Sequence, residues 1–83
     1  MIVRLLYFAR LRERFGLAEE TLEVAGGSVA ALIAQLQRRG GVWAEELGAG
    51  RPFRVAVDQE IVALDAALAE GAEVAIFPPV TGG

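Results

Sequence analysis

Five short segments of the chain carry the residue pattern of β-strands. They cover residues 2–8, 20–24, 53–57, 61–64 and 73–77. The segments are rich in β-branched and aromatic residues, and residues 20–24 alternate between polar and apolar positions, as half-buried strands do. The third and fourth segments are joined by residues 58–60, a link short enough for a hairpin although it lacks the glycine that tight turns favour. We therefore expect a sheet of about five strands.

A helical spacing replaces this pattern between the second and third predicted strands. Four apolar residues there share one helix face: Val29, Leu32, Ile33 and Leu36. Ser28 is placed to be the N-cap, and Gly40-Gly41 is expected to end the helix. Shorter helical segments are expected at 9–15, closed by Gly16, and at 43–47, with a turn at 66–70. One main helix covers only one face of a sheet, so the sequence predicts an α+β fold, a mixed sheet with that helix packed on one face.

Strand alternation divides the side chains of the sheet into two sets. The set expected beneath the helix is Leu5, Tyr7, Leu22, Val24, Phe53, Val55, Val57, Val62, Leu64, Val74 and Ile76. The set on the open face includes four large apolar residues: Leu6, Phe8, Ile61 and Phe77. Clustered apolar residues on an open face are typical of a partner-binding surface. Scattered exposed apolar residues are also common, so this remains a prediction.

The last six residues, PPVTGG, do not fit a helix or a strand. Pro78 and Pro79 have no amide hydrogen and favour an extended backbone, as do the β-branched Val80 and Thr81. Gly82 and Gly83 carry no side chains, so an enclosing wall could approach their backbone closely. Fully extended, the segment spans roughly 20 Å. We therefore predict a domain over residues 1–77 and an extended, flexible tail over 78–83 that inserts the Gly83 carboxylate into a narrow active site of another protein.

Such a carboxylate has a defined chemistry. Its attack on the α-phosphate of ATP gives an acyl-adenylate, which then accepts either sulfur or an amine. The partner would bind the ATP and stabilise the developing charge. A Gly-Gly end taken alone is also compatible with an inert chain terminus.

Composition narrows the possible functions. The chain has no Cys, His or Lys, so the usual nucleophiles and the commonest proton shuttle are missing; we expect no stand-alone enzyme, no metal site and no intrinsically bound cofactor. A net charge of −3 without an arginine–aromatic stripe argues against nucleic acid. No segment resembles a signal peptide or a membrane span, so we expect a soluble, cytoplasmic protein. The carboxylates of Glu19, Glu20, Glu45, Glu46 and Asp65 are expected to be solvated surface charges.

The ending FPPVTGG (77–83) resembles the C-terminal signature of the small subunit of molybdopterin synthase, a ubiquitin-like β-grasp sulfur carrier. YFARLRE (7–13), VWAEEL (42–47) and the whole of residues 56–83 are similar to the same family. One departure is Asp58, where the family often has Asn, which adopts left-handed conformations more readily.

The resemblance implies a function and partners. A ubiquitin-activating-enzyme-like adenylyltransferase would use ATP to adenylate Gly83, and a sulfur donor protein would supply the sulfur for a thiocarboxylate. The chain would then dock on the large subunit in a heterotetramer and pass sulfur to a cyclic pyranopterin precursor in molybdenum cofactor biosynthesis. The family's interface positions correspond to Phe8, Ile61 and Phe77.

Three alternatives stay open on the sequence. The first is a related sulfur carrier for thiazole or cysteine synthesis, and the second is a ubiquitin-like modifier conjugated to proteins through Gly83. The third, of a different class, is a plain interaction domain with an inert tail.

Overall fold

All five predicted strands are present in the computed structural model, which describes residues 1–79. The strands are β1 (Ile2–Tyr7), β2 (Glu19–Glu23), β3 (Arg54–Val57), β4 (Glu60–Val62) and β5 (Glu73–Phe77). The helices are α1 (Ala9–Phe15), α2 (Val29–Gln37) and α3 (Gly41–Glu46). Both predicted short helices are therefore confirmed. The turn predicted at 66–70 is displaced: turns lie at 64–65 and 70–71, and between them Ala67 forms an isolated β-bridge with Ser28.

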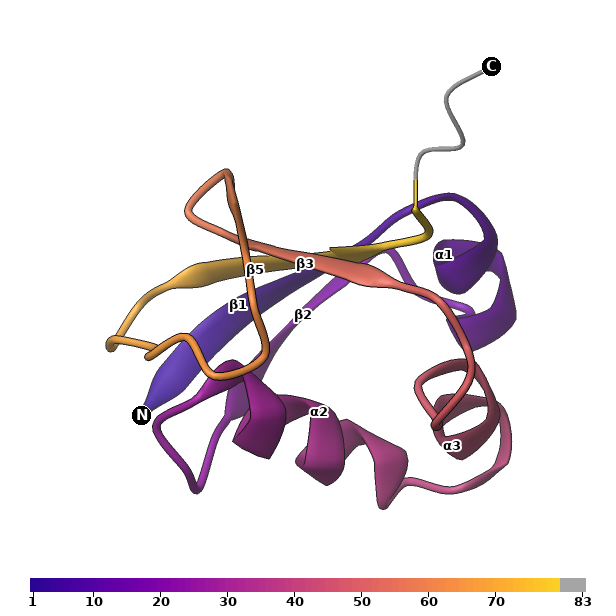
Figure 1. Cartoon of the computed structure of the whole chain (residues 1–83), viewed down its shortest axis with the longest axis horizontal. Coiled ribbons are helices and arrows are strands. Elements are labelled where there is room, and N and C mark those ends of the chain that lie inside the picture. The colour runs from indigo at the N-terminus through magenta and orange to yellow at the C-terminus, as the bar shows by residue number, and fades with distance from the viewer. Residues whose placement is uncertain (80–83) are drawn as a thin grey trace.

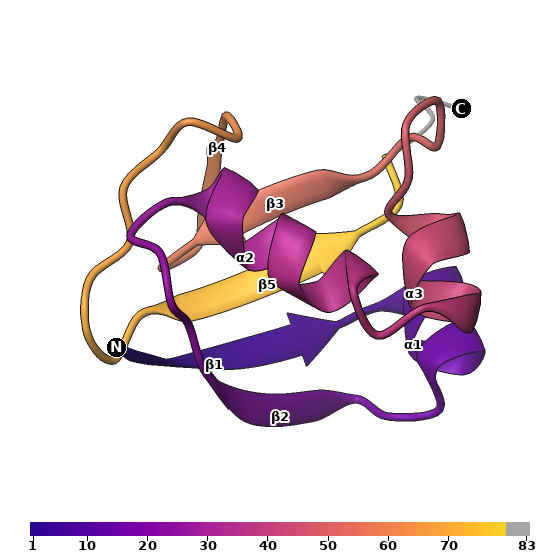
Figure 2. The same cartoon turned by 90° about the horizontal axis from the view of Figure 1, so that it is seen from below.

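The strands form one mixed sheet in the order β2-β1-β5-β3-β4. β1 and β5 are parallel, and the other pairs are antiparallel. α2 crosses one face of the sheet, and α1 and α3 close one end, as Figures 1 and 2 show. Among the described residues, no helix covers the opposite face (Figure 1). The predicted α+β architecture with one main helix on one face is confirmed.

The first turn of α2 explains why β4 is shorter than predicted. Each of the first four amide N–H groups of a helix needs a partner outside the helix ladder. The Ser28 side chain accepts from the Ala31 N–H at 3.1 Å, as its N-cap position predicts. The carbonyls of Leu64 and Ala66 accept from the N–H groups of Ala30 and Val29, at 2.7 and 3.0 Å. The chain therefore leaves the sheet after Val62 and wraps over the start of α2.

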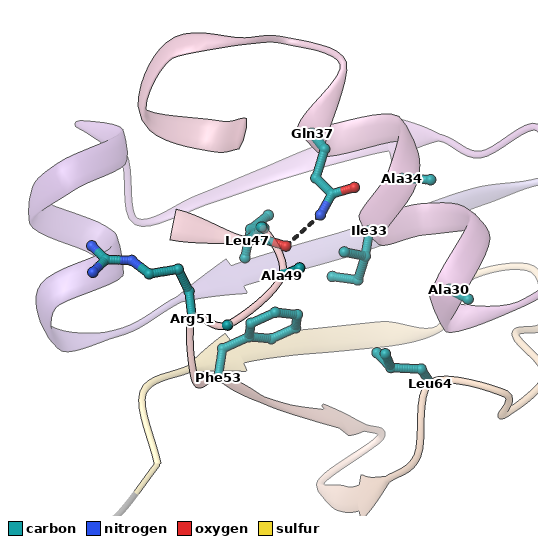
Figure 3. Close-up of a pocket in the computed structure, with 11 residues that line it drawn as sticks. Ala30, Ile33, Ala34, Gln37, Leu47, Ala49, Arg51, Phe53 and Leu64 are labelled. Atoms are coloured by element: carbon teal, nitrogen blue, oxygen red, sulfur yellow. Dashed lines mark hydrogen bonds between the residues drawn. The ribbon is translucent and has the colours of Figure 1, made fainter. Parts of the chain in front are cut away.

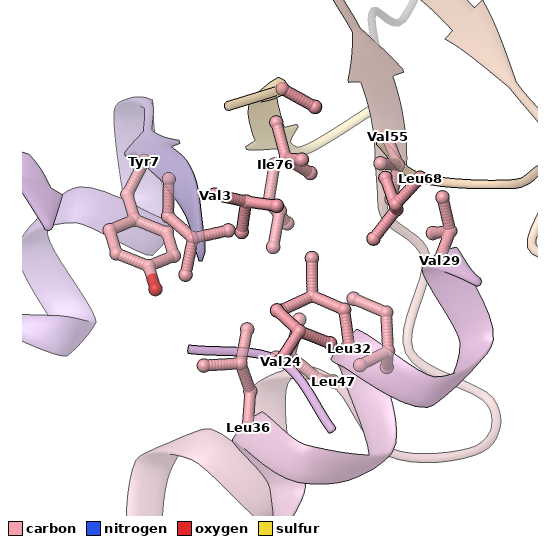
Figure 4. Packing of buried hydrophobic residues seen from close by; sticks show 14 of the residues in the cluster. Val3, Tyr7, Val24, Val29, Leu32, Leu36, Leu47, Val55, Leu68 and Ile76 are labelled. Carbon is pink, nitrogen blue, oxygen red and sulfur yellow. The ribbon is translucent and has the colours of Figure 1, made fainter. Parts of the chain in front are cut away.

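The core lies between α2 and the sheet, and Figure 4 shows how its side chains interdigitate. Fully buried members from the sheet include Leu5, Tyr7, Val74 and Ile76, all placed beneath the helix by strand alternation. The prediction for Leu64 was wrong: 48% of it is exposed, because β4 ends before it. Leu68 and Ala72 are buried members that no periodic pattern indicated, since they lie in the irregular segment before β5.

The hairpin between β3 and β4 forms without glycine. Asp58 and Gln59 occupy its two turn positions with positive φ angles of 49° and 73°. Two successive positive φ values are the signature of the tight turn whose twist matches that of the flanking strands. The Asp58 carboxylate also accepts from the Glu73 N–H at 3.1 Å, which fixes the turn to the start of β5.

No helix in the described part of the chain is long and apolar enough to cross a membrane.

Candidate functional site

The four predicted interface residues all belong to the open face of the sheet. The strand register places one row across this face, from Leu6 through Ala75 and Ala56 to Ile61. Neighbouring strands lie roughly 5 Å apart, so Leu6 and Ile61 stand about 15 Å from one another with two alanines between them. This row is therefore apolar from Leu6 to Ile61, with large side chains at both ends and methyl groups in the middle.

Phe8 and Phe77 extend this apolar row toward the end of β5. Phe8 follows β1, and its N–H donates to the Ile76 carbonyl at 3.3 Å, which sets it beside Phe77. Phe8 is 45% exposed and Ile61 68% exposed, while Leu6 and Phe77 are half-buried. We call the set Leu6, Phe8, Ile61 and Phe77 the open-face patch.

The chain leaves the sheet directly from this patch. Pro78 and Pro79 follow Phe77 without regular secondary structure and are half-buried. The remaining predicted tail residues, Val80, Thr81, Gly82 and Gly83, lie outside the described residues. The point of departure, which we call the tail exit, lies at the end of the molecule where α1 and α3 pack (Figure 2).

One carboxylate near this end corrects a prediction made from the sequence. Glu46, expected to be solvated, is only 2% exposed. Its Oε2 accepts from Arg14 Nε and Arg51 Nη2, both at 3.0 Å, and its Oε1 lies 3.4 Å from Arg10 Nε. Burial by itself raises the pKa of a carboxyl group, but the hydrogen bond and charge of Arg51, with help from Arg10 and Arg14, hold the pKa of Glu46 below its ordinary value of 4.5.

The sequence is matched by a family model described as the ThiS family, over residues 5–83. This chain belongs to the ThiS family. Curated relatives include the molybdopterin synthase sulfur carrier subunits of Haemophilus influenzae and Escherichia coli. The first is 37% identical over 82 residues, and the second 39% identical over 84 residues; each match covers 99% of this chain and 100% of the relative.

A solved structure similar to this ThiS-family chain contains two proteins. It is a complex of subunits 1 and 2 of the molybdopterin-converting factor from Helicobacter pylori. The matched chain of that complex is 25% identical to this chain with a TM-score of 0.71, and the match covers 100% of each of these two chains. The resemblance stated from FPPVTGG is thereby confirmed, and the fold is the ubiquitin-like β-grasp.

A second ionic cluster of the ThiS-family chain, formed by Glu20, Arg39 and Tyr7, corrects the prediction for Glu20. Its carboxylate, 19% exposed, accepts two hydrogen bonds from Arg39, at 2.8 and 2.9 Å, and one from the Tyr7 hydroxyl at 2.7 Å. Arg39 also lies 4.4 Å from the ring centre of Trp43. The hydrogen bond from Arg39 has the largest effect on the pKa of Glu20 and lowers it. The pKa of the Tyr7 hydroxyl is raised, mainly by burial and secondly by its hydrogen bond to Glu20. The cluster ties the sheet to the α2–α3 link.

The structure also has an open groove of about 430 Å³ between α2 and the 47–53 segment, which Figure 3 shows. Ile33, Leu47, Phe53 and Leu64 line it, and Gln37 crosses it to donate to the Leu47 carbonyl. The groove lies on the helix side of the sheet, away from the open-face patch. It contains no group of carboxylates, and nothing in its lining suggests a reacting centre.

Residues 1–79 contain no group of three or more His, Cys, Asp or Glu side chains that could hold a metal ion. The described residues of the candidate site are those of the open-face patch and the tail exit.

Proposed function

We propose that this chain is a sulfur carrier, the small subunit of a molybdopterin synthase. The observation that carries the proposal is the continuity of the open-face patch with the tail: Phe8 and Phe77 lie at the point from which Pro78 and Pro79 lead toward Gly83. A partner that covers the patch receives the tail in the same contact. Full-length similarity to two sulfur carrier subunits supports this assignment.

The chemistry begins at the Gly83 carboxylate. One of its oxygens attacks the α-phosphorus of ATP, which a ubiquitin-activating-enzyme-like adenylyltransferase binds, and pyrophosphate leaves. A sulfur donor protein then supplies sulfur at the oxidation level of sulfide, which attacks the acyl carbon; the bond from that carbon to the AMP oxygen breaks, AMP leaves, and Gly83 ends in a thiocarboxylate. The chain itself binds no cofactor in this sequence of steps. It contributes the acyl group, and its lack of side chains at Gly82 and Gly83 allows entry to a narrow site.

The loaded carrier then acts on the large subunit. We propose that the open-face patch docks on that subunit and that the tail enters its active site, where sulfur passes to a cyclic pyranopterin precursor. The complex of subunits 1 and 2 from Helicobacter pylori supports a partner of this kind. Two copies of each subunit would form a heterotetramer acting in the cytoplasm.

Intact mass spectrometry tests the proposal. The chain is incubated with ATP, a sulfur source and the adenylyltransferase of its own organism. We expect the mass to rise by the difference between sulfur and oxygen, and a chain lacking Gly83 to stay unchanged. An unchanged mass for the full chain, under conditions that load a known carrier, would contradict the proposal. Amide-linked adducts on other proteins in a lysate would instead favour protein modification.

A further inference from the structure

Charge is distributed unevenly between the two ends of the molecule. Residues 8–18 and 38–54, which form the end with α1, α3 and the tail exit, hold seven of the eight arginines but only three of the eleven acidic residues. Their formal charge is +4, so the rest of a chain with a net charge of −3 carries −7. The basic end is the one from which the tail departs.

The arginines at this end form what we call the arginine collar: Arg10, Arg12, Arg14, Arg51 and Arg54. Three of them are held by the buried Glu46 and still expose 49%, 39% and 45% of their side chains (Arg10, Arg14 and Arg51, respectively). Arg14 also donates to Glu45 at 2.7 Å. A guanidinium group has five N–H donors, so these two carboxylates still leave most donors of the three arginines available. Glu46 thus fixes three cationic groups while satisfying only part of their hydrogen-bonding capacity.

The other two arginines are exposed. Within residues 1–79, no carboxylate lies within ion-pairing distance of Arg12 or Arg54. Arg54 is the register partner of Phe77, so it lies at the edge of the open-face patch, next to the tail exit. Arg12 is in α1, which begins directly after Phe8.

We propose that the arginine collar is an electrostatic docking surface for a carboxylate-rich rim around the tail-accepting site of a partner protein. This inference rests on the proposed function, because it assumes that a partner receives the tail. A planar guanidinium group matches a carboxylate in a two-bonded geometry, and groups already held in place lose less entropy on binding. The adjacent apolar patch favours a protein partner over nucleic acid, since protein interfaces combine an apolar centre with a charged rim.

The collar acts mainly on the rate of encounter. Rim charges steer two proteins into the correct orientation, and their removal lowers the association rate constant and its dependence on salt. Here the opposite ends of the carrier differ in sign, so an acidic rim attracts the tail-exit end and repels the other end. The tail therefore reaches the partner first.

Two matched double variants test the collar. Arg12→Gln with Arg54→Gln removes two collar charges, and Gln59→Glu with Ala69→Glu places two negative charges on exposed positions at the other end. Both change the formal net charge from −3 to −5. Association of each with the molybdopterin synthase large subunit of the same organism is measured by stopped flow at several salt concentrations.

We expect the collar variant to associate about tenfold more slowly at low salt, with a flatter salt dependence, while the control stays within about twofold of the unmodified chain. Equal rates for the collar variant and the unmodified chain, or equal losses in both variants, would overturn the collar. Binding of inorganic phosphate to the isolated chain, lost in the collar variant, would overturn its assignment to protein carboxylates. Failure of the unmodified chain to bind at any salt concentration would instead contradict the proposed function, and the collar with it.

Discussion

Glu46 shows how one side chain can organise an end of the molecule. It lies in α3, yet its partners come from α1 and from the loop before β3, so a single carboxylate connects three segments. A buried carboxylate is stable only when charged or hydrogen-bonded neighbours compensate its desolvation. Glu45, its neighbour in sequence, is 60% exposed and contacts Arg14 alone.

Replacement of Glu46 by Gln removes the charge but nearly preserves the shape of the side chain. We expect a loss of about 2 kcal/mol in the free energy of unfolding, because hydrogen bonds to charged groups are replaced by weaker ones and three arginines lose their common counter-charge. Glu45→Gln is the matched control and should cost less than about 0.5 kcal/mol. Urea unfolding measures both, and equal costs would show that Glu46 has no special role.

The sequence could not reveal this difference between Glu45 and Glu46. In VWAEEL the two carboxylates have nearly the same local context, and both were expected to be solvated. One of the two partners of Glu46 in α1, Arg14, is 32 positions away along the chain. Burial of a charge is decided by such long-range pairing, which the spacing of apolar residues does not encode.

At the scale of single elements, local patterns predicted much of the structure. α2 begins directly after Ser28, because that serine caps the helix. β5 covers the five predicted residues, because its apolar side chains alternate regularly. The end of α2 was less accurate. The helix stops at Gln37, and Gly40-Gly41, predicted to end it, instead provides the N-cap and first residue of α3, since the chain turns at once into the next helix.

The glycine-free hairpin gives a prediction at this scale. Gln59 has a φ of 73°, a region that costs non-glycine residues about 1 kcal/mol. Gln59→Gly should therefore raise the free energy of unfolding by about 0.5–1 kcal/mol, despite the greater entropy of glycine in the unfolded chain. Gln59→Ala is the control and should give no gain. Thermal unfolding of the two variants checks this, and a destabilised glycine variant would contradict the argument.

The Glu20 cluster gives a pH dependence for the link between the sheet and the α2–α3 segment. The folded-state pKa of Glu20 is lowered below its ordinary value of 4.5, so the ionised form favours the folded state. Its stabilisation is complete above pH 4.5 and is lost as the pH falls through the folded-state pKa. Glu20→Gln should therefore flatten the decline in unfolding free energy as the pH falls below the ordinary pKa of 4.5. The same slope in both proteins, measured by urea unfolding at each pH, would contradict this role.

At the scale of the whole molecule, the open-face patch separates binding from stability. Phe8 is exposed, so Phe8→Asp should leave the free energy of unfolding within about 1 kcal/mol of the unmodified chain. It should weaken binding to the large subunit by about 2 kcal/mol, near 30-fold, as loss of an aromatic anchor does. Ile2→Asp is the matched control: Ile2 is 51% exposed and lies at the other end of β1 on the same face. Equal effects of the two variants in a calorimetric titration would refute the patch.

The whole-molecule prediction succeeded where strand alternation alone was sufficient. The residues Leu6, Phe8, Ile61 and Phe77 were placed on one face from periodicity, and the register of four strands (β1, β5, β3 and β4) brings them to one face of the sheet. The uneven distribution of charge between the two ends of the molecule was not predicted, because the arginines come together only when α1 and the loop before β3 meet. Sequence therefore indicated the apolar part of the candidate interface and missed its basic border.

The central claim is that a tail whose end has no side chains enters a narrow site of a partner protein. Replacement of Gly82 and Gly83 by leucines tests this claim most directly. The variant keeps a terminal carboxylate and the entire described fold, but its side chains would meet the walls of a narrow site. The measurement is the initial rate of molybdopterin formation in the presence of the large subunit, the adenylyltransferase, ATP and a sulfur source. Ala69→Leu is the control, at an exposed position far from the tail exit. We expect at least about a 100-fold loss for the tail variant and a normal rate for the control, because small displacements of a reacting group have effects of this size. A normal rate from the tail variant would contradict the account.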